Sequence, residues 1–124
     1  MPTILVIEDD RNIREGLIDL LEVEGFNVLV ADNGADGVEK ARQFLPDLIL
    51  SDINMPKLDG FGVLAQVKRS ASTASIPFIL MSATVGPEEL ERGIMLGATD
   101  YMPKPFRVEA LLHTVQKALE NCVG

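Results

Sequence analysis

The chain has 124 residues, and a hydrophobic content of 47% supports one domain with a single core over residues 1–124. Its net charge of −8 at pH 7 argues against a nucleic-acid backbone or an anionic membrane as a direct partner, and favours a cation or a basic protein surface. Cys122 is the single cysteine, so an internal disulfide is excluded. With no secretory leader and no membrane-spanning apolar run, the expected location is the cytoplasm.

Short apolar runs alternate along the chain with segments of helical periodicity, a pattern typical of βαβ units around a parallel sheet. We therefore expect an α/β fold with five strand–helix pairs. Most of the strands are apolar throughout, as expected where helices cover both faces of a sheet. The predicted strands are residues 3–7, 27–31, 48–51, 77–82 and 99–102.

Two helices are marked by apolar residues at the i, i+3, i+4, i+7 spacing. The first helix carries Ile13, Leu17, Leu20 and Leu21, and the last carries Val108, Leu111, Leu112, Val115 and Leu119. Helix boundaries follow from capping and turn residues. We expect N-caps at Asp10, Asn33 and Asp59, a helix start at Gly86-Pro87, and helix ends at Gly25 and Gly97.

Acidic residues follow two of the predicted strands. The first strand leads into Glu8 and Asp9, and the third leads into Asp52, with Asn54 two residues later. Because the carboxyl ends of parallel strands meet at one edge of the sheet, these side chains should lie close together. Clustered carboxylates repel one another unless a cation neutralises them, and Mg²⁺ prefers such oxygen ligands. The sequence therefore predicts a magnesium site at this edge.

Two further polar residues belong to the same edge. Ser82 ends the fourth predicted strand, and Lys104 follows the fifth. A lysine ammonium and a serine hydroxyl would hold the oxygens of a phosphoryl group bonded to Asp52. This arrangement would make Asp52 a nucleophile.

These motifs resemble the receiver domain of bacterial two-component response regulators. The resemblance covers essentially the whole chain and is carried by Glu8-Asp9, Ser82-Ala83 and the stretches at residues 52–60 and 97–106. It implies the flavodoxin-like doubly wound (βα)5 fold, a five-stranded parallel sheet in the order 2-1-3-4-5 with helices on both faces.

The resemblance also implies a role for each metal-site residue. Asp52 corresponds to the phosphoacceptor, and Glu8 and Asp9 correspond to the acidic pair that positions Mg²⁺. Asn54 corresponds to the residue that lends a backbone carbonyl to the metal. Glu8 stands where Asp is more frequent, and its longer side chain leaves both direct binding and binding through water open.

The switch and phosphoryl-contacting positions are implied in the same way. Ser82 and Lys104 match the residues that contact the phosphoryl group, and Tyr101 matches the switch aromatic that moves inward when the Ser82 hydroxyl is drawn toward it. The peptide before Pro105 is expected to be cis. Thr84 and Asn54 occupy positions that tune the lifetime of the phosphoryl group.

The function implied is phosphorelay signal transduction. A histidine kinase or a histidine phosphotransfer protein would donate the phosphoryl group to Asp52, and the domain would catalyse its own phosphorylation and slow dephosphorylation. The alternatives are a binding module that is never phosphorylated, a small-molecule phosphohydrolase with an aspartyl intermediate, and a flavin carrier. Asn54 stands where phosphohydrolases usually need a second Asp, and the acids of the first loop would repel a flavin phosphate.

The expected output surface comprises the fourth helix, the fifth strand and the fifth helix. Leu90, Ile94 and Met95 give the fourth helix more apolar surface than one core stripe requires. A downstream protein or effector domain would bind there, with homodimerisation on phosphorylation as a further possibility. His113 is expected on the solvated side of the last helix.

Overall fold

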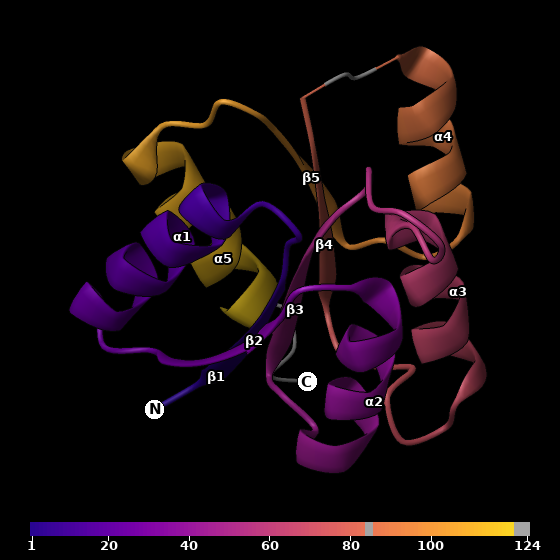
Figure 1. The fold of residues 1–124 in the computed structure, drawn as a ribbon, viewed down its shortest axis with the longest axis horizontal. Helices are drawn as coiled ribbons and strands as arrows, with labels where there is room; N and C mark the ends of the chain where they lie inside the picture. Colours follow the sequence, from indigo (N-terminus) through magenta and orange to yellow (C-terminus); the bar gives the residue numbers. More distant parts are fainter. Residues whose placement is uncertain (84–85, 121–124) are drawn as a thin grey trace.

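The computed structural model describes residues 1–83 and 86–120, and its five strands and five helices alternate strictly along the chain (Figure 1). Thr84 and Cys122, singled out in the sequence, lie outside the described residues. The elements are β1 (Thr3–Ile7), α1 (Arg11–Val23), β2 (Asn27–Ala31), α2 (Gly34–Phe44), β3 (Leu48–Asp52), α3 (Gly60–Arg69), β4 (Phe78–Ser82), α4 (Pro87–Met95), β5 (Asp100–Pro103) and α5 (Val108–Glu120).

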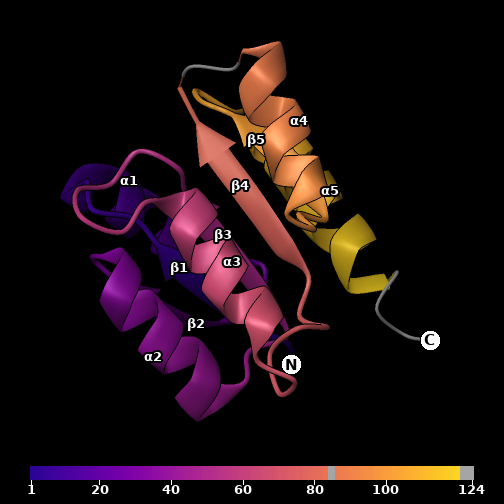
Figure 2. The same ribbon diagram turned by 90° about the vertical axis from the view of Figure 1, so that its right-hand side faces the viewer.

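The strands form one parallel sheet in the order β2-β1-β3-β4-β5, which confirms the predicted doubly wound topology. Helices α1 and α5 cover one face, and α2, α3 and α4 cover the other (Figures 1 and 2). The strand order reverses between β1 and β3, because β2 is added on the outer side of β1 whereas β4 and β5 are added on the outer side of β3. The carboxyl ends of β1 and β3 therefore flank the crevice where ligands of this fold class bind.

Each face of the sheet has its own hydrophobic core, because successive strand residues point to opposite sides. In β1, Leu5 and Ile7 join the core under α2 and α3, whereas Ile4 and Val6 join the core under α1 and α5. All four side chains are fully buried. The near-continuous apolar runs in the sequence are thus explained by burial on both faces.

Helix capping follows the predicted turn chemistry. The Asp10 carboxylate accepts hydrogen bonds from the backbone amides of Asn12 and Ile13, and Asn33 and Asp59 cap α2 and α3 through their side-chain oxygens. Gly86 and Pro87 begin α4, and Gly25 and Gly97 follow α1 and α4 with positive φ. These confirmed caps fix where each loop leaves the sheet edge.

The predicted boundaries differ from the structure by one residue at three strands. Asp52 is the last residue of β3, β4 begins at Phe78, and β5 runs from Asp100 rather than from residue 99. Val108 was expected on the core face of the last helix, but it is the first residue of α5 and is 47% exposed. Residues 108–110, the first turn of that helix, are all exposed, so periodicity alone misassigned Val108. No helix in the described part of the chain is long and apolar enough to cross a membrane.

Candidate functional site

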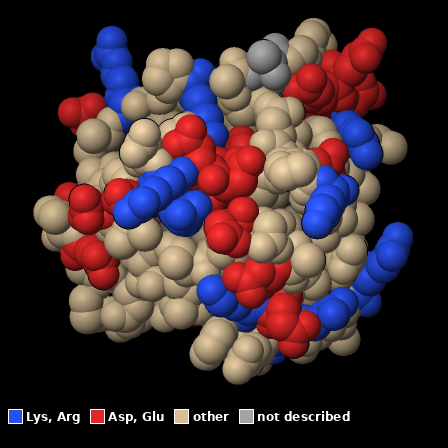
Figure 3. Space-filling view, in the orientation of Figure 1, with Lys and Arg blue, Asp and Glu red and all other residues tan. Residues whose placement is uncertain are grey.

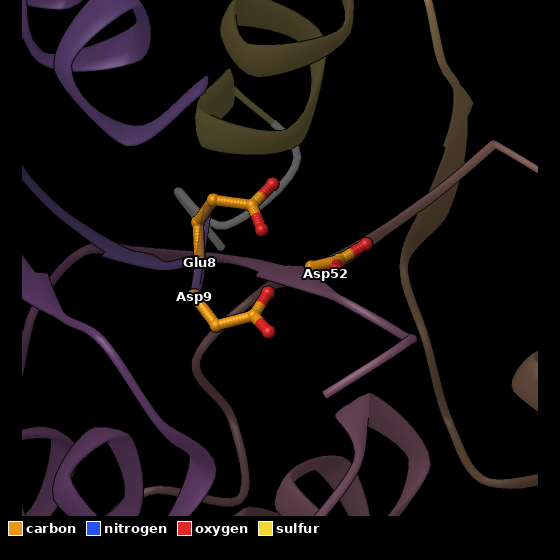
Figure 4. A group of neighbouring side chains, drawn as sticks. All are labelled: Glu8, Asp9 and Asp52. Carbon is orange, nitrogen blue, oxygen red and sulfur yellow. The ribbon is translucent and has the colours of Figure 1, made fainter. Parts of the chain in front are cut away.

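The predicted acids meet where β1 and β3 end. Ile7 lies beside Ser51 in the parallel register, so the next residues, Glu8 and Asp52, lie at the same level at the carboxyl end of the sheet. Glu8 and Asp9 both direct their carboxyl groups toward the side on which Asp52 lies (Figure 4). One carboxylate oxygen from each of the three residues falls within a group whose members are all within 4.8 Å of one another.

This acidic group has the composition of a site for a hard divalent cation. Glu8 is fully buried and Asp52 is 5% exposed, whereas Asp9 is open to solvent. Buried carboxylates at this spacing repel one another, and oxygen ligands beside an open face suit Mg²⁺, which keeps several of its waters. The side chains present therefore fit a magnesium ion.

Lys104 joins the group from the end of β5. Its Nζ lies 3.1 Å from Asp52 Oδ1 and also pairs with Glu8 Oε1. Burial acts to lower the pKa of Lys104, but the bonds to Glu8 and Asp52 outweigh it, so the pKa is raised. The ammonium is thus held charged against the oxygen of Asp52. The peptide between Lys104 and Pro105 is cis, as expected.

Glu8 is affected differently by the same ion pair. Its burial raises the pKa, the bond to Lys104 opposes the rise, and the charge of Asp52 adds to it, so the pKa of Glu8 is raised. The raised pKa favours the charged form of Lys104 but the neutral form of Glu8. This contrast has a structural cause, because Lys104 faces two carboxylates whereas Glu8 has one ammonium to compensate for complete burial. In the absence of a metal, the site carries an excess of negative charge.

Ser82, Asn54 and Tyr101 form a hydrogen-bonded group beside these charges. The side-chain amide of Asn54 donates to Ser82 Oγ at 3.2 Å, and the Tyr101 hydroxyl donates to the Ser82 backbone carbonyl at 3.4 Å. Ser82 is fully buried, and Tyr101 is half-buried. Burial raises the pKa of Tyr101, so its hydroxyl stays protonated and able to donate. The structure therefore connects the aromatic side chain to the backbone of the residue next to the charged group.

The loop after Asp52 turns back tightly onto the end of β3. The Gly60 amide donates to the Ile53 carbonyl at 2.9 Å, and a Cβ on Gly60 would lie 2.4 Å from the backbone oxygen of Asp52. Only glycine leaves room for this approach. The start of α3 is consequently packed against the peptide of the candidate nucleophile.

Arg14 is a residue of this site that the sequence did not point to. Its Nη1 donates to the backbone carbonyl of Glu8 at 2.9 Å. An arginine near the start of an amphipathic helix is normally expected to face solvent, so nothing in the sequence predicted this contact.

A mainly apolar cavity of about 430 Å³ lies next to Lys104, between α1 and the segment that follows β5. Gly16 forms part of its wall, and a Cβ on Gly16 would meet no atom within 4 Å. The other lining residues include Ile13, Leu20, Ala83 and Phe106. The cavity is open space directly beside the charged group.

Three surface features agree with the sequence analysis. Acidic side chains gather near the middle of the face in Figure 3, where Figure 1 shows β1 reaching the edge of the sheet. On α4, Leu90, Ile94 and Met95 are 40%, 65% and 80% exposed. His113 is exposed on α5, as expected.

Comparison with known proteins gives close relatives over nearly the whole chain. The chain is 40% identical over 119 residues to protein PilH of Pseudomonas aeruginosa, an alignment covering 96% of this chain and 98% of PilH. It is also 40% identical over 121 residues to the DNA-binding dual master transcriptional regulator RpaA of Synechocystis, covering 98% of this chain and 50% of RpaA. The chain thus spans about half the length of several curated relatives that it matches.

Solved structures agree in fold. The chemotaxis protein CheY4 of Vibrio cholerae superposes with a TM-score of 0.91 and 31% identity, covering 95% of this chain and 98% of CheY4. The receiver domain of the sensor histidine kinase PA1611 of Pseudomonas aeruginosa superposes with a TM-score of 0.89 and 25% identity, covering 96% of this chain and 98% of that domain, and it holds a magnesium ion in its active-site cleft. The family model of the response regulator receiver domain matches residues 4–116, and the chain belongs to this family.

Proposed function

We propose that this domain, taken as residues 1–124, accepts a phosphoryl group on Asp52 in a two-component phosphorelay. Membership of the receiver family supports phosphorelay signalling in general. The observation that carries the specific assignment is the position of Lys104, whose ammonium lies 3.1 Å from Asp52 Oδ1 at the open acidic edge. A carboxylate in this setting is oriented, partly desolvated and charge-compensated, as a nucleophile requires.

The donor would be the phosphohistidine of a histidine kinase or a histidine phosphotransfer protein. An oxygen of Asp52 forms the new bond to phosphorus while the bond from phosphorus to the histidine nitrogen breaks. Lys104 and the Ser82 hydroxyl hold the phosphoryl oxygens, so that catalysis consists mainly of positioning and charge neutralisation. The apolar cavity beside Lys104 supports a protein donor, because it offers a contact surface next to the nucleophile.

The magnesium site of this proposal consists of Glu8, Asp9, Asp52 and the backbone carbonyl of Asn54. When bound, Mg²⁺ neutralises the carboxylates and the charge that develops on the phosphoryl group. Glu8 is already engaged by Lys104 and by the Asp10 amide, which lies 3.3 Å from Oε2. Asp9, Asp52 and the Asn54 carbonyl would therefore hold the ion directly, and Glu8 would contact it through water.

The signal would reach the surface through Ser82 and Tyr101. Because the Tyr101 hydroxyl bonds to the Ser82 carbonyl, movement of Ser82 toward a phosphoryl group would release or redirect the ring. The phosphoryl group would favour one of the two arrangements and so shift their populations. The exposed apolar residues of α4, beside β5 and α5, form the proposed output surface for a downstream protein, an effector domain or a second copy of the chain.

The experiment that tests this function is intact-protein mass after incubation with acetyl phosphate or phosphoramidate, with and without Mg²⁺. We expect a Mg²⁺-dependent gain of one phosphoryl group, slowly lost on standing, and no gain in Asp52→Asn. Absence of any gain in the native chain would refute the proposal and favour a binding module that acts without phosphorylation. The cytoplasmic location inferred from the sequence remains a prediction.

The output surface has a separate test. Leu90→Glu or Met95→Glu should weaken phosphorylation-dependent self-association or partner binding while leaving the mass gain unchanged, because both residues are exposed on α4 and absent from the acidic site. Normal association in both variants would exclude this surface.

A further inference from the structure

The turn that carries the acidic pair is fixed at nearly every peptide. Glu8 donates its amide to the Ala31 carbonyl of β2 at 3.0 Å, and Asp10 is held as the N-cap of α1. Between them, the carbonyl of Glu8 accepts the hydrogen bond from Arg14 Nη1 at 2.9 Å. Asp9 therefore extends from a turn whose two neighbouring residues are both restrained.

The bond from Arg14 bears directly on Asp9. A peptide unit is planar, so the position of the Glu8 carbonyl oxygen sets the orientation of the Asp9 amide and thereby the direction in which the Asp9 side chain leaves the backbone. Asp9 is exposed, so burial does little to orient its side chain. Without the guanidinium, the Glu8–Asp9 peptide would lose the hydrogen bond that restrains its carbonyl oxygen.

Arg14 does not act here as an ion-pair partner. Among the described residues, its recorded hydrogen bond goes to a backbone carbonyl, and no carboxylate lies within ion-pair distance of it. Its charge nevertheless stands near the acidic group, where it would repel a divalent cation. The two effects of Arg14 on metal binding therefore have opposite signs.

We infer that Arg14 is a positioning residue for the divalent cation site, which holds the Glu8–Asp9 peptide so that the Asp9 carboxylate faces Asp52. This inference rests on the magnesium site of the proposed function. Preorganised ligands bind a metal more tightly because less freedom is lost on binding, and partners that orient metal ligands typically contribute a factor of 10 to 100 in affinity. The geometric gain outweighs the repulsion from the guanidinium charge.

The test is calorimetric titration of the unphosphorylated chain with Mg²⁺ at constant ionic strength, for the native chain, Arg14→Met and Arg11→Met. Arg11 lies on the same helix, is exposed and pairs with Glu15, so it provides the same charge change without a contact to the turn. We expect the Kd for Mg²⁺ to rise about tenfold in Arg14→Met and to stay equal or fall slightly in Arg11→Met.

The sign of the change decides the outcome. If Arg14 were only a surface charge, its removal would tighten Mg²⁺ binding, so an equal or lower Kd in Arg14→Met would overturn the inference. Failure of the native chain to bind Mg²⁺ would instead overturn the proposed metal site itself. Should Arg14→Met not fold, Arg14→Leu, which likewise has no hydrogen-bond donor for the carbonyl, is measured with the same expectation.

A second measurement needs no metal. In the metal-free protein, Arg14→Met should speed amide hydrogen exchange at Asp9 and Asp10 relative to Arg11→Met, because the turn loses one of its restraints. Unchanged exchange at both amides would likewise contradict the positioning role.

Discussion

Two glycines in this chain occupy opposite environments, although both lie within helices. Gly16 in α1 faces the open cavity, and an added Cβ would touch nothing within 4 Å. Gly60, at the start of α3, would place a Cβ 2.4 Å from the Asp52 backbone oxygen. Helix propensity favours alanine at both positions, so the surrounding atoms alone decide whether the substitution stabilises the fold.

We expect Gly16→Ala to raise the free energy of unfolding by about 0.5–1 kcal/mol, the usual gain from removing a glycine inside a helix. Gly60→Ala should lower it by about 1–3 kcal/mol, because the backbone must move to accept the methyl group. Urea denaturation of the two variants and the native chain measures both changes. A destabilised Gly16→Ala would mean that the cavity is filled or closed in solution.

Glu8 gives the stability of the metal-free protein a defined pH dependence. Its pKa is raised in the folded state from an ordinary value of 4.5, mainly by burial. A carboxyl group of this kind binds its proton more tightly when folded, so its contribution to stability is complete below the unfolded pKa. That contribution is lost as the pH rises through the raised pKa of the folded state.

The variant Glu8→Gln imitates the protonated carboxyl at every pH. We therefore expect its stability relative to the native chain to increase from pH 4.5 toward neutrality, as the native Glu8 becomes ionised. Urea denaturation in the presence of EDTA at several pH values gives this difference. A relative stability that stays constant or declines with pH would show that the ion pair with Lys104 dominates over burial.

At the scale of the element, α4 stands out for how little of it is buried. Gly93 is its buried residue, and a Cβ there would lie 2.8 Å from Leu80 Cδ1, so the helix sits closely on β4 at this one point. Arg92 lies over the Phe61 ring of α3, with Cζ 4.5 Å from the ring centroid. These contacts anchor a helix whose other apolar side chains face outward.

Removal of the cation–π contact should therefore loosen α4 more than the rest of the fold. We expect Arg92→Gln to speed amide hydrogen exchange across α4 while lowering the global free energy of unfolding by only about 0.5–1 kcal/mol. Arg42→Gln on α2, where the arginine is exposed, is the control with the same charge change. Exchange in α4 that matches the control would show that the ring contact contributes nothing to its anchoring.

At the scale of the whole molecule, net charge and the acidic site act together. With a formal charge of −8, any added salt relieves repulsion within the fold, so a specific metal effect must be separated from screening. A ligand that binds only the folded state stabilises it by about 2.7 kcal/mol at a concentration of 100 times its Kd. Magnesium should meet this description if Asp9 and Asp52 hold it.

We expect the Tm of the native chain to rise with Mg²⁺ concentration and to rise much less with KCl at the same ionic strength. In Asp9→Asn the Tm should rise similarly with the two salts, because the solvent-exposed carboxylate of the metal site is lost. Differential scanning calorimetry measures each midpoint. Equal responses to the two salts in the native chain would show that screening accounts for the whole effect.

The fold and the types of residue at the site were predictable for a physical reason. Buried parallel strands require continuous apolar runs, amphipathic helices require their own period, and the confirmed caps at Asp10, Asn33 and Asp59 act within three residues of their partners. Interactions of this kind join residues that are close together in the sequence, so the sequence pattern is enough to predict them. The acids after β1 and β3 were likewise brought together by the topology that those patterns specify.

The sequence by itself therefore determined the elements, the α/β class and the edge at which Glu8, Asp9, Asp52 and Lys104 gather. Only the tertiary structure decided which atoms of these side chains pair with one another and with neighbouring residues. It pairs Lys104 with two carboxylates that stand 96 and 52 residues away, joins Asn54 to Ser82, and turns Arg14 back onto the Glu8 carbonyl. These contacts depend on side-chain rotamers and on distances of a few tenths of an ångström, which are set only when the helices and loops have packed against the sheet.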